Sequence, residues 1–213
     1  MKPAPGKPLV VKVGGSLAES GRLADILDIL ARAKRPLVVV PGGGPFADAV
    51  RELQPELGLS DAAAHRMAIL AMHQMAEVMV ALKPRWVTAE GVAAMRRAWR
   101  AGRVPVWLPA VMSLRDTLIP CDWSITSDGL AARLAERLGR VPVVLVKSCD
   151  VDRRASATAL ARAGVVDPVF AEIVARAGLD WRVIGAGDDA GLAELVSAPP
   201  SRRPRPERPA ARR

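Results

Sequence analysis

The chain has 213 residues, a length that suits one domain with a substantial core. Half of the residues are apolar, yet only seven are Phe or Trp and none is Tyr, so the core must consist of Ala, Val, Leu, Ile and Met. Only Cys121 and Cys149 are present, without metal-ligand spacing, and we find no signal peptide or membrane-spanning stretch. The sequence therefore predicts a cytoplasmic protein without a protein-bound metal centre.

The net charge of +9 would by itself indicate a partner such as nucleic acid. The segment 199–213, however, holds six arginines against Glu207, a net of +5, and leaves only +4 for the rest of the chain. Such a Pro- and Arg-rich segment cannot bury enough apolar surface to fold, so we predict a disordered tail. We favour a solvated extension over a nucleic-acid contact, because no aromatic residue interleaves the arginines for base stacking.

Apolar runs alternate with helix-like segments along residues 1–198. Strands are predicted at 9–13, 37–40, 86–88, 104–108, 143–146 and 182–184. Helices are predicted at 21–33, 45–57, 61–82, 91–100, 127–138, 168–177 and 188–196. This alternation predicts one α/β domain, with a mainly parallel sheet between two layers of helices.

Two glycine turns directly follow apolar strands, in LVVKVGGS at 9–16 and in PLVVVPGGGPF at 36–46. Glycine lets backbone N–H groups approach a phosphate, and the following helix N-terminus adds partial positive charge. Lys12 adds a full charge beside the first turn. Neither turn is a P-loop or a G-x-G-x-x-G fingerprint, and a single such turn is ordinarily structural. The pair with Lys12 predicts a site that holds two phosphate-bearing ligands face to face.

The order KVGGS, VVVPGGG, ITSDGLAARLA and VVLVKSCDVD resembles the amino acid kinase superfamily over about residues 9–198. The resemblance implies a three-layer α/β/α sandwich that moves the γ-phosphoryl group of ATP, with Mg²⁺, to a carboxylate or a phosphate. PGGGPFADAVR, AAAHRMAI and DWSITSD are most similar to the [5-(aminomethyl)furan-3-yl]methyl phosphate kinases of methanofuran-type cofactor biosynthesis. That branch implies a small monophosphate acceptor.

The resemblance carries several catalytic and nucleotide-side roles over to this chain. Lys12 matches the lysine that contacts the transferred phosphoryl group, and Asp128 matches the aspartate that holds this lysine in place. Asp128 could instead only complement a helix dipole. The residues matched to the ATP phosphates and the nucleotide turn are Gly14, Gly15, Ser16, Asp150 and Asp152.

The acceptor side is assigned to the second glycine turn, Gly42, Gly43 and Gly44, together with Arg51. Arg51 lies two helical turns further on and could clamp the acceptor phosphate, or simply be a solvated surface arginine. Trp123 could stack on a furan ring or be a core tryptophan. A substrate ammonium group could pair with either Asp116 or Asp122, and the sequence does not choose between them.

The long helix predicted at 61–82 resembles the dimer-forming helix of the superfamily, which implies a homo-oligomer. His65 and His73 on it are eight residues apart, too far for a metal pair, and are interpreted as packed or partly exposed side chains. Its methionines are interpreted as core filler.

The nucleotide half departs from the superfamily pattern. Cys149 and Arg153 replace the usual Thr and Gly of the nucleotide turn, and no lysine follows Lys147 where relatives place a second phosphate-contacting lysine. Arg153, Arg154 or Arg176 could supply the missing cation. Three hypotheses follow: a monophosphate kinase of the furan branch, a kinase of this fold for another acceptor, and a non-catalytic subunit that has lost the nucleotide half.

Overall fold

The computed structural model describes residues 7–198, and the predicted tail lies outside them. Its strands form one six-stranded sheet in the order β3-β4-β2-β1-β5-β6, and every pairing is parallel. The strands are β1 (Leu9–Val13), β2 (Leu37–Pro41), β3 (Trp86–Ala89), β4 (Val104–Trp107), β5 (Val143–Val146) and β6 (Trp181–Ile184).

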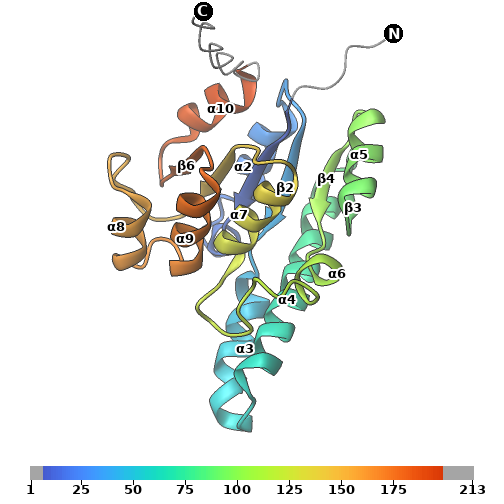
Figure 1. Ribbon diagram of the computed structural model, residues 1–213. Helices are drawn as coiled ribbons and strands as arrows, with labels where there is room; N and C mark the ends of the chain where they lie inside the picture. Colours follow the sequence, from blue (N-terminus) through green and yellow to red (C-terminus); the bar gives the residue numbers. More distant parts are fainter. Residues whose placement is uncertain (1–6, 199–213) are drawn as a thin grey trace, which may run out of the picture.

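The helices surround this sheet in the arrangement shown in Figure 1. They are α1 (Ser16–Glu19), α2 (Leu23–Ala31), α3 (Gly44–Leu57), α4 (Asp61–Leu82), α5 (Val92–Arg100), α6 (Ala110–Ser113), α7 (Ser127–Arg137), α8 (Ala157–Arg162), α9 (Pro168–Ala177) and α10 (Asp189–Ser197). The predicted three-layer α/β/α architecture is confirmed. The short helices α1, α6 and α8 were not predicted, since four to six residues carry no readable helical period.

Alternating side chains of the strands supply two cores. Val10, Val143 and Leu145 belong to one core, together with residues of α7 and α9. Val11 and Val144, their neighbours in sequence, belong to the other, together with residues of α2 and α10. Because both faces are buried, the strands are continuous apolar runs, as parallel strands covered on both faces require.

The chain reverses its direction across the sheet between β1 and β5. From β1 it proceeds to β2 on one side, whereas β5 and β6 lie on the other side. In parallel sheets, ligands bind beyond the carboxyl ends of the strands at such a switch point. Both glycine turns begin at this edge, where α3 and α4 project beyond the sheet (Figure 1). No helix among the described residues is long and apolar enough to cross a membrane.

Candidate active site

Two lysines face the same helix because of the strand register. Lys12 follows Val11, whose side chain belongs to the α2 face, and therefore points to the α7 face. Lys147 follows Val146, another residue of the α2 face, and its N–H continues the β5–β6 ladder to Ile184. Since Val13 pairs with Val146 in the parallel register, the two lysines lie close together at the carboxyl edge.

Asp128 at the start of α7 joins these two lysines. Its Oδ1 lies 3.0 Å from Lys12 Nζ, and its Oδ2 lies 2.5 Å from Lys147 Nζ. Lys12 is 5% exposed and Asp128 1% exposed, so their contact is shielded from solvent, whereas Lys147 is partly exposed. Two ammonium groups and one carboxylate leave one net positive charge, which suits a site that receives a phosphoryl group.

The charges of the cluster depend on one another. Burial lowers the pKa of Lys12 below its ordinary value, although Asp128 opposes this shift. Burial alone would raise the pKa of Asp128, but Lys12 and Lys147 together hold it below its ordinary value. Among the described residues, Oδ1 of Asp128 accepts no aligned hydrogen bond despite its contact with Lys12. Because an ammonium group has three N–H donors, Lys12 can donate to a phosphoryl oxygen while it contacts Asp128.

Asp167 fixes the turn that carries Asp128. Its Oδ2 accepts hydrogen bonds from Thr126 N, Thr126 Oγ1 and Gly129 N at 2.9, 2.7 and 2.8 Å, on either side of Asp128. Its Oδ1 caps α9 through Phe170 N at 2.7 Å. Burial and then the charge of Asp128 raise the pKa of Asp167, while these hydrogen bonds oppose the shift. Asp167 was not among the predicted site residues, because its role depends on the contact between α7 and α9.

The two glycine turns touch each other backbone to backbone. A Cβ on Gly15 would lie 2.2 Å from Gly44 N, and a Cβ on Gly42 would lie 2.4 Å from Gly15 N. Part of the reason for glycine is therefore this contact, in addition to the predicted approach of a phosphate. Ser16 Oγ lies 2.8 Å from Ser148 Oγ, which links the first turn to the segment after β5.

Three of the predicted acceptor residues, Gly43, Arg51 and Trp123, line one small cavity of about 50 Å³ beside α7, whereas Gly42 and Gly44 do not line it. The Arg51 guanidinium lies over the Trp123 ring, 4.6 Å from its centroid, and also pairs with Asp48. Trp123 Nε1 donates a hydrogen bond of 2.6 Å to Gln54 Oε1. Gly43, which was predicted as an acceptor residue, lines this cavity beside His65, which was not predicted as one.

Both histidines of α4 have identifiable surroundings. His65 is 5% exposed and lines the acceptor cavity, a location that its sequence position did not indicate. Burial lowers the pKa of His65, although the neighbouring Asp122 opposes this shift. Nε2 of His73 accepts a hydrogen bond from Ala110 N at 3.1 Å, so His73 anchors the start of α6.

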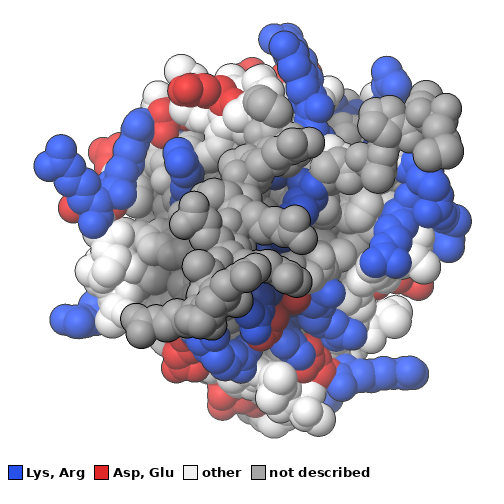
Figure 2. Space-filling model, turned by 45° about the horizontal axis from the view of Figure 1, so that its top comes forward, with Lys and Arg blue, Asp and Glu red and all other residues white. Residues whose placement is uncertain are grey.

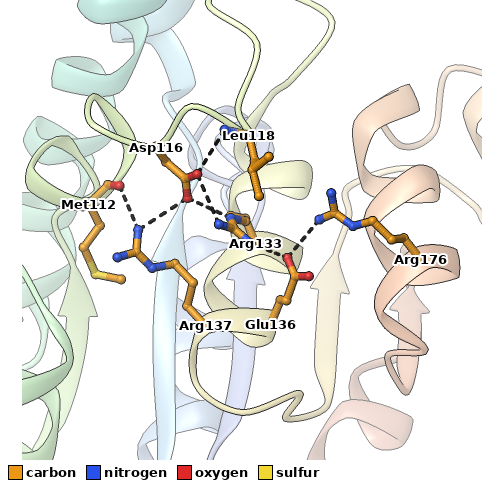
Figure 3. Close-up of polar contacts among 7 residues, drawn as sticks. All are labelled: Met112, Asp116, Leu118, Arg133, Glu136, Arg137 and Arg176. Atoms are coloured by element: carbon orange, nitrogen blue, oxygen red, sulfur yellow. Dashed lines mark hydrogen bonds and ion pairs between the residues drawn. The ribbon is translucent and has the colours of Figure 1, made fainter.

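Figure 3 shows why Asp116 is not free to bind a substrate ammonium group. Arg133 donates to both Asp116 oxygens, at 2.7 and 3.1 Å, and Arg137 lies 3.4 Å from one of them. Asp116, one of the two predicted partners of a substrate ammonium group, is thus paired with arginines of α7. Asp122 accepts a hydrogen bond from Ser124 N and faces His65 instead.

Two of the three arginines considered as replacements for a second lysine pair with carboxylates. Arg176 pairs with Glu136 at 2.9 Å (Figure 3), and Arg153 pairs with Asp188 at 2.6 Å. Lys147 instead supplies the second ammonium group beside Lys12. Asp150 and Asp152 lie exposed on the loop after β5, where Asp152 accepts a hydrogen bond from Arg154 N.

Among residues 7–198 no cluster of three or more His, Cys, Asp or Glu side chains is suited to a metal ion. Asp128 is committed to two lysines and Asp167 to four hydrogen bonds. Neither carboxylate is therefore available as a free ligand. Magnesium that retains water and phosphate ligands would suit this site better than a fully protein-bound ion.

Comparisons with known proteins give matches to kinases. The family model described as "Amino acid kinase family" matches residues 7–153. The [5-(aminomethyl)furan-3-yl]methyl phosphate kinase of Methanocaldococcus jannaschii is 26% identical over 144 residues, which cover 66% of this chain and 66% of that relative. The match thus spans just under two thirds of the relative's length.

Solved structures share the fold at low sequence identity. The uridylate kinase from Archaeoglobus fulgidus superposes with a TM-score of 0.65 at 19% identity, covering 89% of this chain and 95% of that one. The carbamate kinase from Giardia lamblia bound to AMP-PNP gives a TM-score of 0.53 at 12% identity, covering 90% and 94%. At these identities the likeness shows the fold alone.

Proposed function

Because the chain belongs to the amino acid kinase family, we propose that it is an ATP-dependent kinase that converts a small monophosphate to a diphosphate. Family membership agrees with the resemblance found in the sequence, and the relatives named above are kinases. The observation that carries the proposal is the Lys12–Asp128–Lys147 cluster, of which Lys12 and Asp128 are buried, beside two touching glycine turns. MgATP is the co-substrate, with Mg²⁺ carried by its phosphates.

The residues of this chain would promote transfer by position and charge. An acceptor phosphate oxygen attacks the γ-phosphorus of ATP, its bond to phosphorus forms as the bond to the ADP oxygen breaks, and ADP leaves. Lys12 and Lys147 neutralise charge on the phosphoryl oxygens, while Asp128 holds both ammonium groups in place. The N-termini of α3 and α7 add partial positive charge at the same edge.

The acceptor that we propose is [5-(aminomethyl)furan-3-yl]methyl phosphate, on a methanofuran-type pathway in the cytoplasm. The named relative from Methanocaldococcus jannaschii supports this choice, and so does a cavity that combines Arg51 with the Trp123 ring. ADP release should be measured over a panel of this compound, UMP, an isoprenoid monophosphate, N-acetylglutamate and carbamate. If another acceptor gave the highest kcat/KM, the furan assignment would be contradicted. If no acceptor of the panel were turned over, the result would favour a non-catalytic subunit.

Arg51→Ala is expected to raise the acceptor KM by about tenfold or more, with the ATP KM little changed. A charge-assisted contact to the acceptor phosphate is worth roughly 1.5–3 kcal/mol, and its loss weakens ground-state binding. Steady-state kinetics with each substrate varied in turn provides the measurement. Arg66→Ala, which removes another arginine near the start of α4, is the matched control. A rise in the ATP KM alone would place the second glycine turn on the nucleotide side.

We also propose that two copies associate through α4. Leu70, Val78 and Leu82 on this helix are 52%, 36% and 47% exposed, on a helix pair that projects beyond the sheet (Figure 1). Light scattering after size exclusion should show a dimer that Leu70→Asp converts to a monomer. Leu118→Asp, at a similarly exposed leucine that is not part of α4, should leave the dimer intact. A monomeric unmodified protein would refute this assembly.

A further inference from the structure

A second cavity, of about 570 Å³, lies at the amino ends of β2, β3 and β4, on the sheet edge opposite the lysine cluster. Small-molecule sites typically measure about 300–1,000 Å³. The cavity is lined by the chain connections before these three strands and by the end of α2. Five of its lining residues are basic and none is acidic: Lys34, Arg35, Lys83, Arg85 and Arg103.

Three of these cations have partners that hold them in place. Lys83 Nζ lies 2.6 Å from Asp28 Oδ1. Arg103 donates to the carbonyl oxygens of Arg85 and Trp86, at 3.4 and 3.1 Å. Arg35 donates to Lys7 O at 3.2 Å. These contacts fix the walls of the cavity, and nearby carboxylates offset two of the three charges: Asp28 acts on Lys83, and Asp180 acts on Arg35.

The remaining capacity for hydrogen bonding is substantial. The side chains of Lys34 and Arg85 are exposed and form no ion pair or hydrogen bond with any of the residues 7–198. Nε of Arg35 is buried and has no partner within the same part of the chain. A ligand that accepts several hydrogen bonds and carries negative charge would satisfy these donors.

Helix dipoles do not balance this charge. Helices α2, α4 and α5 end at this edge, and α10 ends beside Lys34, whose N–H donates to Val196 O. Each carboxyl end carries roughly half a negative charge, about −2 in total. With Asp28 and Asp180, the negative charge near the cavity amounts to roughly −4, against five basic side chains. A positive surplus of roughly one charge remains beside a cavity of small-molecule size.

We propose that this cavity binds a compact multivalent anion of the di- or triphosphate class. Figure 2 shows the face that includes this edge, where Lys and Arg side chains gather with Asp and Glu among them rather than in a continuous stripe. A cavity of limited volume beside mixed surface charge suits a small anion better than a nucleic-acid strand. With strands of four or five residues between the two edges, the site lies roughly 15 Å from the lysine cluster.

Titration calorimetry with inorganic tripolyphosphate tests the proposal. We expect two equivalents to bind to the unmodified protein, one at each edge of the sheet. The double variant Lys34→Ala/Arg85→Ala should bind tripolyphosphate in the cavity at least about tenfold more weakly and should still bind the second tripolyphosphate at the lysine cluster. Its kinase turnover should be unchanged. The Lys12→Ala variant should still bind one tripolyphosphate in the cavity. The control Arg96→Ala/Arg162→Ala removes the same charge from exposed positions outside the cavity and should retain both.

Three results would overturn the proposal. Unchanged binding in Lys34→Ala/Arg85→Ala would exclude the cavity, and equal weakening in both double variants would reduce the effect to net charge. Binding of a single-stranded oligouridylate that tripolyphosphate does not displace, lost only in Lys34→Ala/Arg85→Ala, would assign the surface to nucleic acid. Because the proposed kinase activity is measured separately with Lys12→Ala, failure of either proposal leaves the other testable.

Discussion

Replacing Lys12 with alanine is expected to lower the rate of phosphoryl transfer by at least about 10²-fold and to leave the fold intact. The loss corresponds to one positioned charge at a transition state. The fold should persist because Asp128 keeps its 2.5 Å contact with Lys147, so no buried carboxylate is left without a cation. Single-turnover kinetics and a thermal melt measure the two effects separately.

Lys83→Ala is the matched control for Lys12→Ala. It also removes a lysine paired with an aspartate, but at the opposite edge of the sheet, so turnover should stay near normal. The variant without both Lys12 and Lys147 should lose stability as well as activity, since Asp128 would then be buried and unpaired. Near-normal turnover of Lys12→Ala would disprove its catalytic assignment.

Much of the fold was predictable because each strand is an apolar run between helical periods. The six strands appear at or within two residues of the predicted positions, and the expected parallel sheet is confirmed. The order of the strands was not predictable, since the register between β1 and β5 arises from packing of segments more than 100 residues apart. That register brings Lys12 and Lys147 together.

The candidate site was predictable only where a motif marked it. Lys12 and Asp128 were predicted from the motifs KVGGS and ITSD. Lys147 was noted only as the last lysine of the chain, with no second phosphate-contacting lysine after it. A usable signal was present: Lys147 directly follows an apolar strand, as Lys12 lies at the end of another, and carboxyl ends of parallel strands share one edge. The motif AAAHRMAI contains His65 but gave it no role, and Asp167 carried no such signal, because tertiary contacts bring both side chains to the site.

Gly15→Ala is expected to destabilise the protein by about 1–3 kcal/mol and to reduce turnover sharply, because the new methyl group forces apart the two glycine turns. The backbone angles of Gly15, φ −63° and ψ −38°, are those of an ordinary helical residue, so alanine is not disfavoured by conformation. Space is the limiting factor: a Cβ would lie 2.2 Å from Gly44 N and 2.4 Å from Gly44 Cα. Both atoms belong to the backbone and cannot rotate away.

Gly91→Ala is the matched control for Gly15→Ala, since a Cβ there meets no atom within 4 Å and φ is −155°. Chemical denaturation should show a midpoint near that of the unmodified protein for Gly91→Ala and a clearly lower one for Gly15→Ala. Turnover should fall in Gly15→Ala even at temperatures where the variant is fully folded, because both turns are displaced beside Lys12. If Gly15→Ala matched the control in stability and rate, the contact between the two turns would not be what requires glycine at position 15.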